Sequence, residues 1–315
     1  MPRLLLLGLF SLATYGAAFT LSYPLIPLAT MGAPADIGAI TAYSKDAAAM
    51  YVSSLALLFA LYGLSIHGAA SAGRDHRAIW VVFGVGAGAA LLLSFVYPYG
   101  AADIFLYIVR GRVLGIYGLN SLVVPPSYTP VAPYLPFTSE WAAVPSPYGP
   151  LWEWVAAGLA RLGDGSSLAS LLAFKGWGAL CYLGSGLLLS DILCRESPAR
   201  WVAGLIAFMW NPLVLLETMA MGHNDMFMVF FVLLAIWFTV RSCYGGAYVA
   251  LGLGALVKHI PLLLVPPTIL WMARHLPPPA FRRHLLCGLA VALLLIGLVW
   301  WPLWPGWGGM PFLKQ

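Results

Sequence analysis

Charged residues are scarce in this chain. Asp, Glu, Lys and Arg make up only 9% of its 315 residues, whereas 61% of the residues are hydrophobic and the mean hydropathy is +0.87. In soluble domains about a quarter of the residues are charged. This shortage excludes an ordinary soluble protein, and it predicts an all-α polytopic membrane protein.

Other features that commonly indicate function are also missing. The four cysteines form no CxxC pair, so neither a disulfide framework nor a zinc site is expected. No basic stripe with interleaved aromatic residues accompanies the net charge of +5, which excludes a nucleic-acid partner. Neither a repeat nor a linker rich in Gly and Ser divides the chain. We therefore expect residues 1–315 to form a single transmembrane domain in contact with membrane lipids.

Apolar runs are the main positive signal. A helix needs about 20 apolar residues to cross a bilayer. Seven runs approach this length, and two shorter runs, 245–257 and 262–273, bring the expected number of membrane segments to about nine. The first run could be a secretion signal, but it lacks a clean small-residue cleavage site, so we favour an anchor. The seven longer runs are 4–20, 48–67, 79–97, 168–193, 201–219, 225–241 and 284–304.

The distribution of cations predicts the orientation of the chain. Lys and Arg in short loops are retained on the cytoplasmic side of a membrane. This rule predicts a cytoplasmic N-terminus in the plasma membrane, provided that segment 150–162 lies along the outer surface as an interfacial helix. Residues 98–162 then form an extracytoplasmic loop, and the many prolines of 98–149 interrupt regular structure there.

The eleven acidic residues are few enough to weigh individually. Most lie in loops, but five are expected at the outer surface or just below it, where carboxylates are costly and therefore functional candidates. These five are Asp103, Glu140, Glu153, Glu217 and Asp225.

Asp103 opens a stretch with helical spacing. Tyr107 and Arg110 follow at i+4 and i+7 and share its face, and Arg112 comes two residues later. Three charges on the cation-poor side oppose the topology rule, which favours a function. The alternative is an interfacial helix whose charges reach water at the surface.

A second group of polar residues connects two apolar runs. Glu217 lies near the end of one run, and Gly222-His223-Asn224-Asp225 forms the turn before the next. Asn224 or Asp225 is expected to cap the following helix, although capping alone leaves His223 and Glu217 unexplained.

A third group lies between the two short runs. Lys258-His259 separates them, and Pro261 follows. Half-helices that meet at an ionisable pair are typical of anion sites, and a plain interfacial lysine is the alternative. Trp152 and Trp154 offer flat faces on which sugar rings could stack, and we favour the alternative that they belong to the aromatic belt at the membrane surface.

In this order the motifs resemble a known family. Asp103-x3-Tyr107-x2-Arg110-Gly-Arg112, Ser146-Pro-Tyr-Gly-Pro-Leu151, Asn211-Pro with Gly222-His-Asn-Asp225, and Val257-Lys258 are similar to the GT-C glycosyltransferases that use polyprenyl-phosphate sugars. The closest likeness is to the actinobacterial alpha-1,6-mannosyltransferases. The resemblance implies a GT-C-like helical bundle with Asp103 as general base and a donor sugar, mannose by likeness, delivered on a polyprenyl phosphate. Because relatives have more helices at their C-terminus, it also indicates a C-terminally truncated sequence.

The residues fit such a reaction. A carboxylate can accept the proton of an attacking sugar hydroxyl, and a phosphodiester leaving group needs cations. We expect the donor phosphate to be bound by Arg110, Arg112, His223 and Lys258. We expect the glycan or lipid-linked acceptor, or a sugar, to be bound by Tyr107, Tyr148, Glu217, Asn224 and Asp225. No cofactor is predicted with certainty, and a divalent cation is left open.

The competing hypothesis is a transporter or flippase for a lipid-linked or anionic solute, because broken helices and buried charges also serve transport. Transporters place their site near the midplane of the membrane, commonly between inverted repeats. In this chain no inverted repeat is detectable, and the candidate residues gather on one predicted side. A single cavity shared by Asp103, Asp225 and Lys258 would favour the enzyme.

Overall fold

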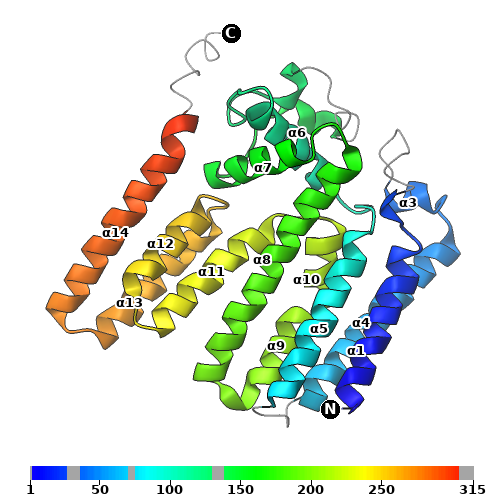
Figure 1. The fold of residues 1–315 in the computed structure, drawn as a ribbon, viewed down its shortest axis with the longest axis horizontal. Helices are drawn as coiled ribbons and strands as arrows, with labels where there is room; N and C mark the ends of the chain where they lie inside the picture. Colours follow the sequence, from blue (N-terminus) through cyan, green and yellow to red (C-terminus); the bar gives the residue numbers. More distant parts are fainter. Residues whose placement is uncertain (1, 27–35, 70–74, 130–137, 305–315) are drawn as a thin grey trace. The chain divides into compact units, whose positions relative to one another are not determined.

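Helices account for all the regular structure found in the described residues. The computed structural model describes residues 2–26, 36–69, 75–129 and 138–304, and it contains no strand there apart from one isolated antiparallel bridge between Pro24 and Val96 (Figure 1). The predicted all-α class is confirmed. Strongly apolar helices satisfy their own backbone hydrogen bonds, which is what a lipid environment demands.

Each predicted apolar run is largely helical, but fewer helices than the nine expected are long enough to cross a membrane. In the described ranges five helices qualify by length and composition, and a bent pair raises the number to six. Helix α11 (Asp225–Val240) is apolar but has only 16 residues. The five long helices are Pro2–Thr20 (α1 with η1), Lys45–Ala69 (α4), His76–Ser94 (α5), Ser167–Glu196 (α8) and Pro278–Leu303 (α14 with η8).

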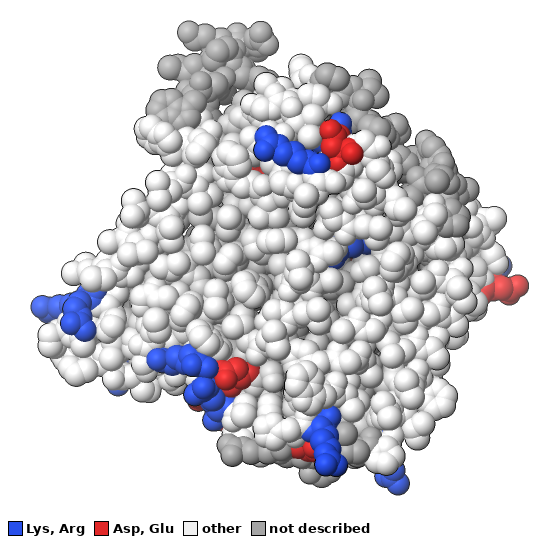
Figure 2. Space-filling view, in the orientation of Figure 1, with Lys and Arg blue, Asp and Glu red and all other residues white. Residues whose placement is uncertain are grey.

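The surface agrees with this composition. In the space-filling view of Figure 2 the charged side chains form a few small groups, and wide areas carry no charge. Large apolar side chains are exposed along these helices, for example Phe10 (62%), Trp80 (77%) and Leu294 (62%). Such exposure is expected where lipid, not water, surrounds the helix.

The chain forms two compact units. Unit 1 comprises residues 1–104 and 165–224. In it α1 packs against α4 and α5, and α9 (Trp201–Met209) packs against α4, α5 and α8. Its remaining elements are α3 (Ile37–Ile40), η5 (Pro198–Arg200), α10 (Pro212–Leu215) and the π-helical turn η6 (Leu216–Ala220).

Unit 2 comprises residues 105–164 and 225–315. Helix α12 packs against both α11 and α14. The helices of this unit include α6 (Asp103–Gly115), whose first two residues belong to unit 1, α7 (Pro150–Leu162), α12 (Tyr244–Ala255), α13 (Val265–His275) and α14 (Pro278–Trp300). Short 3-10 turns are η2 (Pro126–Tyr128), η4 (Ser139–Ala143), η7 (Ile260–Leu264) and η8 (Trp301–Leu303).

A proline bend positions Glu217 in unit 1. Helix α9 ends at Met209, and the path turns by 44° before η6. The side-chain oxygen of Asn211 accepts a hydrogen bond from the Leu213 amide at 3.0 Å, and Pro212 occupies the first helical position, where its missing N–H costs nothing. The expected single run 201–219 is therefore a broken helix whose last turn carries Glu217.

A close backbone contact positions the Ser146–Leu151 loop in unit 2. The amides of Gly149 and Leu151 donate to the carbonyls of Val257 and Leu256 at 3.0 and 3.1 Å. A Cβ atom at Gly149 would lie 2.0 Å from the Leu256 carbonyl oxygen, so only glycine allows this approach. The loop and the residue preceding Lys258 are thus held together.

Substitution of Gly149 should test this contact. Gly149→Ala should lower stability by about 1–3 kcal/mol because the new methyl group forces the two backbones apart. Gly158→Ala is the matched control: a Cβ there meets no atom within 4 Å, and alanine favours the helix. Thermal unfolding of the purified variants in detergent measures both. A loss of equal size in the two variants would contradict the proposed role of the contact.

Candidate active site

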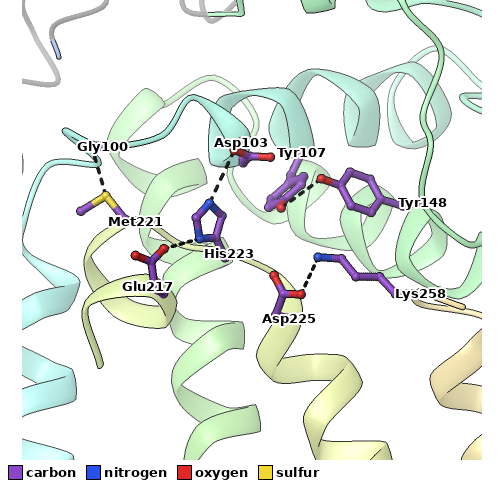
Figure 3. Close-up of polar contacts among 9 residues, drawn as sticks. All are labelled: Gly100, Asp103, Tyr107, Tyr148, Glu217, Met221, His223, Asp225 and Lys258. Carbon is purple, nitrogen blue, oxygen red and sulfur yellow. Dashed lines mark hydrogen bonds and ion pairs between the residues drawn. The ribbon is translucent and has the colours of Figure 1, made fainter. Parts of the chain in front are cut away.

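Asp103, Glu217 and His223 form one cluster in unit 1, here called the acid–histidine cluster. The Nδ1 atom of His223 lies 2.8 Å from a Glu217 carboxylate oxygen, and its Nε2 atom lies 3.5 Å from Asp103 Oδ2 (Figure 3). The imidazole is 24% exposed, whereas the carboxylates of Asp103 and Glu217 are 38% and 45% exposed. The ring thus bridges two acids that are far apart in sequence and that remain open to solvent.

The turn at Gly222 makes this bridge possible. Gly222 has φ +79°, a conformation that side chains rarely adopt, and a Cβ there would lie 2.5 Å from Ile104 Cδ1. The His223 amide donates to the Glu217 carbonyl at 3.0 Å, which closes the turn over η6. Gly100 N–H points at Met221 Sδ at 3.2 Å, so the segment leading to Asp103 also contacts this turn.

The two carboxylates change the proton affinity of the histidine. Hydrogen bonds from the ring to Asp103 and Glu217 raise the pKa of His223 from 6.5 to about 9, although partial burial opposes the shift. The imidazolium form therefore prevails at neutral pH, and both of its N–H groups are directed at carboxylates.

A second group lies in unit 2 and comprises Tyr107, Tyr148, Asp225 and Lys258, here called the tyrosine–lysine group. Lys258 Nζ lies 2.7 Å from Asp225 Oδ1 and 5.4 Å from the centre of the Tyr148 ring. The Tyr148 hydroxyl is 3.3 Å from that of Tyr107. The predicted break around Lys258 is confirmed, because α12 ends at Ala255 and η7 begins at Ile260. Helix α11 begins at Asp225.

Arg110 and Arg112, both expected to bind phosphate, have protein partners. Arg110 is buried, and its guanidinium donates to the Val144 carbonyl at 3.2 Å. Arg112 forms an ion pair of 2.5 Å with Asp164. These contacts tie α6 to the segments that follow it in unit 2.

Glu153 is fully buried in unit 2. Its carboxylate accepts a hydrogen bond of 2.5 Å from the Ser146 hydroxyl, and burial raises its pKa. The link joins α7 to the Ser146–Leu151 loop, which suits a structural role. Trp152, interpreted as a belt residue, is only 2% exposed and packs against Tyr107 and Phe227. The belt interpretation is wrong for Trp152, because its ring is packed in the core of unit 2.

The described part of the chain contains no cluster of potential metal ligands. No group of three or more His, Cys, Asp and Glu side chains there could hold a metal ion. In the acid–histidine cluster the imidazolium occupies the place between the carboxylates that a cation would take. Asn224, expected from the sequence to bind the acceptor or a sugar, is only 4% exposed. The side chain of Glu140 lies outside the described residues.

Unit 1 also contains an aromatic pocket of about 430 Å³. Its lining includes Tyr23, Tyr51, Tyr99, Lys45 and Gly100. The Tyr99 ring lies 4.5 Å from the Tyr23 ring and 6.0 Å from the Tyr51 ring, centre to centre. Burial raises the pKa of Tyr99, and the charge of Glu217 adds to this effect. The pocket therefore borders the acid–histidine cluster.

Together these features define an all-α membrane protein with an exposed acid–histidine cluster. A family model described as "Alpha-(1->6)-mannopyranosyltransferase, N-terminal domain" matches residues 10–274. The chain belongs to this family, which confirms the resemblance seen in its motifs.

A curated relative agrees with the family assignment. The chain is 28% identical over 214 residues to alpha-(1->6)-mannopyranosyltransferase A of Mycobacterium tuberculosis. The match covers 65% of this chain and 39% of the relative, so the chain spans well under half of that protein's length. No solved structure matches the chain.

The shifted pKa of His223 predicts how stability depends on pH. Below 6.5 the folded and unfolded states both carry the proton, and the full stabilisation is present. Raising the pH through about 9 removes it, at a cost of about 2 kcal/mol after allowance for solvent at the two exposed carboxylates. Unfolding measured between about pH 6 and 10 in detergent should show this loss.

Two substitutions separate His223 from other causes of alkaline destabilisation. His223→Gln should abolish the loss above pH 6.5, whereas substitution of the exposed His67 by Gln should leave it unchanged. An identical pH dependence in wild type and His223→Gln would show that the bridge does not stabilise the fold.

Proposed function

We propose that this chain provides the catalytic region of a membrane glycosyltransferase. In this proposal it transfers mannose from a polyprenyl-phosphate donor to a glycan or lipid-linked acceptor on the extracytoplasmic face, with Asp103 as general base. The observation that carries the proposal is the acid–histidine cluster, found in a chain of the mannopyranosyltransferase family.

Asp103 has the properties that a general base requires. Its carboxylate is 38% exposed, so an acceptor hydroxyl can approach it, and the hydrogen bond from His223 fixes its orientation. As the hydroxyl oxygen attacks the anomeric carbon, its proton passes to Asp103 while the bond to the phosphate oxygen breaks. A direct displacement of this kind needs one base.

The contacts of His223 favour a positioning role over the phosphate-binding role that the sequence suggested. Both ring N–H groups are directed at carboxylates, at 2.8 and 3.5 Å, so neither is left for a phosphate oxygen. Glu217 binds the opposite side of the ring. Glu217 thus orients His223, and His223 in turn orients Asp103.

Lys258 is the cation that we assign to the donor phosphate. Its side chain is 21% exposed, and Asp225 and the Tyr148 ring hold it in place. Arg110 and Arg112, in contrast, already bind a carbonyl and a carboxylate. The aromatic pocket beside Glu217 offers rings and hydroxyl groups of the kind that bind sugars. We assign it to the acceptor.

The proposed orientation follows from the cations. Arg3 and Arg77 flank the first spans on the side that we assign to the cytoplasm, which puts the N-terminus inside in this proposal. Asp103 and the turn at His223 are then extracytoplasmic in the plasma membrane, where a lipid-linked donor is accessible.

Substitution of Asp103 tests the general base. Asp103→Asn should lower mannose transfer by about 100-fold or more, because the amide cannot accept the proton. Mass spectrometry of products formed with a defined mannosyl-phosphoryl-polyprenol measures the rate. Asp75→Asn, which changes another aspartate at a helix start, is the control and should retain activity. Wild-type turnover by Asp103→Asn would remove Asp103 from this role.

Substitution of Lys258 tests the donor site. Lys258→Ala should raise the apparent KM for the donor about tenfold or more and leave that for the acceptor nearly unchanged, because the lost contact is to phosphate. Lys258→Arg keeps the charge and should be milder. Equal changes in both KM values would argue against phosphate binding by Lys258.

A further inference from the structure

Lys175 is a cation that no sequence motif marks and that the proposed reaction does not use. It lies within the apolar helix α8 and has no exposed surface. A charged side chain in such a place is costly unless every donor is satisfied. We therefore expect each N–H donor of Lys175 to have a hydrogen-bond acceptor.

Three backbone carbonyls surround its ammonium group. Lys175 Nζ donates to the oxygens of Val96, Met219 and Ala220 at 2.7, 2.8 and 2.7 Å. An ammonium has three N–H donors, so this environment satisfies it completely. A neutral amine has only two donors, which makes the arrangement specific for the charged form.

The partners of Lys175 lie directly beside the acid–histidine cluster in unit 1. Met219 and Ala220 end the π-helical turn η6, which carries Glu217 and leads into Gly222 and His223. Carbonyls at the end of a helix have no donors within the helix and carry partial negative charge. Lys175 satisfies two of them and joins them to Val96, the residue that bridges to Pro24.

We propose that Lys175 is a positioning residue that holds the end of η6 and thereby keeps the Glu217 carboxylate against His223. The inference rests on the proposed function only in treating the cluster as catalytic. The geometric part concerns the folded protein alone.

The ring of His223 reports directly on this role. His223 is faced by Asp103 and Glu217, and Glu217 in turn interacts with Tyr99. In the wild type its titration should have a midpoint near pH 9. If Lys175 acted only as a nearby positive charge, its removal would raise the midpoint. If its removal displaced the Glu217 carboxylate from the ring, the midpoint would fall. The direction of change therefore separates the two effects.

The experiment is an NMR titration of histidine-labelled protein in detergent micelles, with the His223 signal assigned by its absence in His223→Gln. Lys175→Met should lower the proton affinity of His223 by about tenfold or more, and Lys175→Gln, which keeps two N–H donors, by less. Tyr182→Phe is the matched control, because Tyr182 is also buried in α8 and donates to the Met209 carbonyl. It should leave the midpoint unchanged.

An unchanged or raised midpoint in folded Lys175→Met and Lys175→Gln would overturn the proposal. Failure of both variants to fold, with Tyr182→Phe folded, would also overturn it, since Lys175 would then serve folding alone. Absence of mannose transfer by the wild type would contradict the proposed function while leaving the titration result intact. The two ideas can therefore fail separately.

Discussion

The bridge from Asp103 through His223 to Glu217 is the interaction on which the rest of the candidate site depends. A histidine between two carboxylates retains its proton near neutral pH, and a charged ring with both N–H groups engaged holds each acid in place. Without it the exposed carboxylate of Asp103 would lose the hydrogen bond that orients it toward the ring. In the proposed reaction this bridge would direct the carboxylate of Asp103 as the base.

Backbone geometry, more than side-chain packing, supports this bridge. The bend at Asn211-Pro212 places η6, the left-handed Gly222 turns the chain back over it, and the Lys175 ammonium binds its final carbonyls. In unit 2 a comparable device joins the Gly149 loop to the backbone before Lys258. Both units therefore use glycine where another backbone segment or a side chain approaches too closely for a Cβ atom.

Much of the helical layout could be predicted, because long apolar runs and the break at Lys258 are local features of the sequence. The bend at Asn211-Pro212 is not predicted, because the apolar run 201–219 continues through it and indicates a single span. The partners of charged residues could not be predicted. The sequence indicates that Arg110 and Arg112 are available to a phosphate, yet their partners lie 34 and 52 residues further on, at Val144 and Asp164. The role of Lys175 could not be predicted either. It lies within an apolar run, and its carbonyl acceptors come from distant segments that only folding brings together.

Whether the acid–histidine cluster acts as a unit in sugar transfer is tested most directly by a double-mutant cycle on its rate. Transfer from a mannosyl-phosphoryl-polyprenol would be compared in Asp103→Asn, His223→Gln and the double variant. When two residues act as one unit, removing either one already removes the contribution of both. The double variant should therefore be about as slow as Asp103→Asn alone. Losses that multiply would show that His223 does not work through Asp103, and they would contradict a catalytic unit built on the bridge.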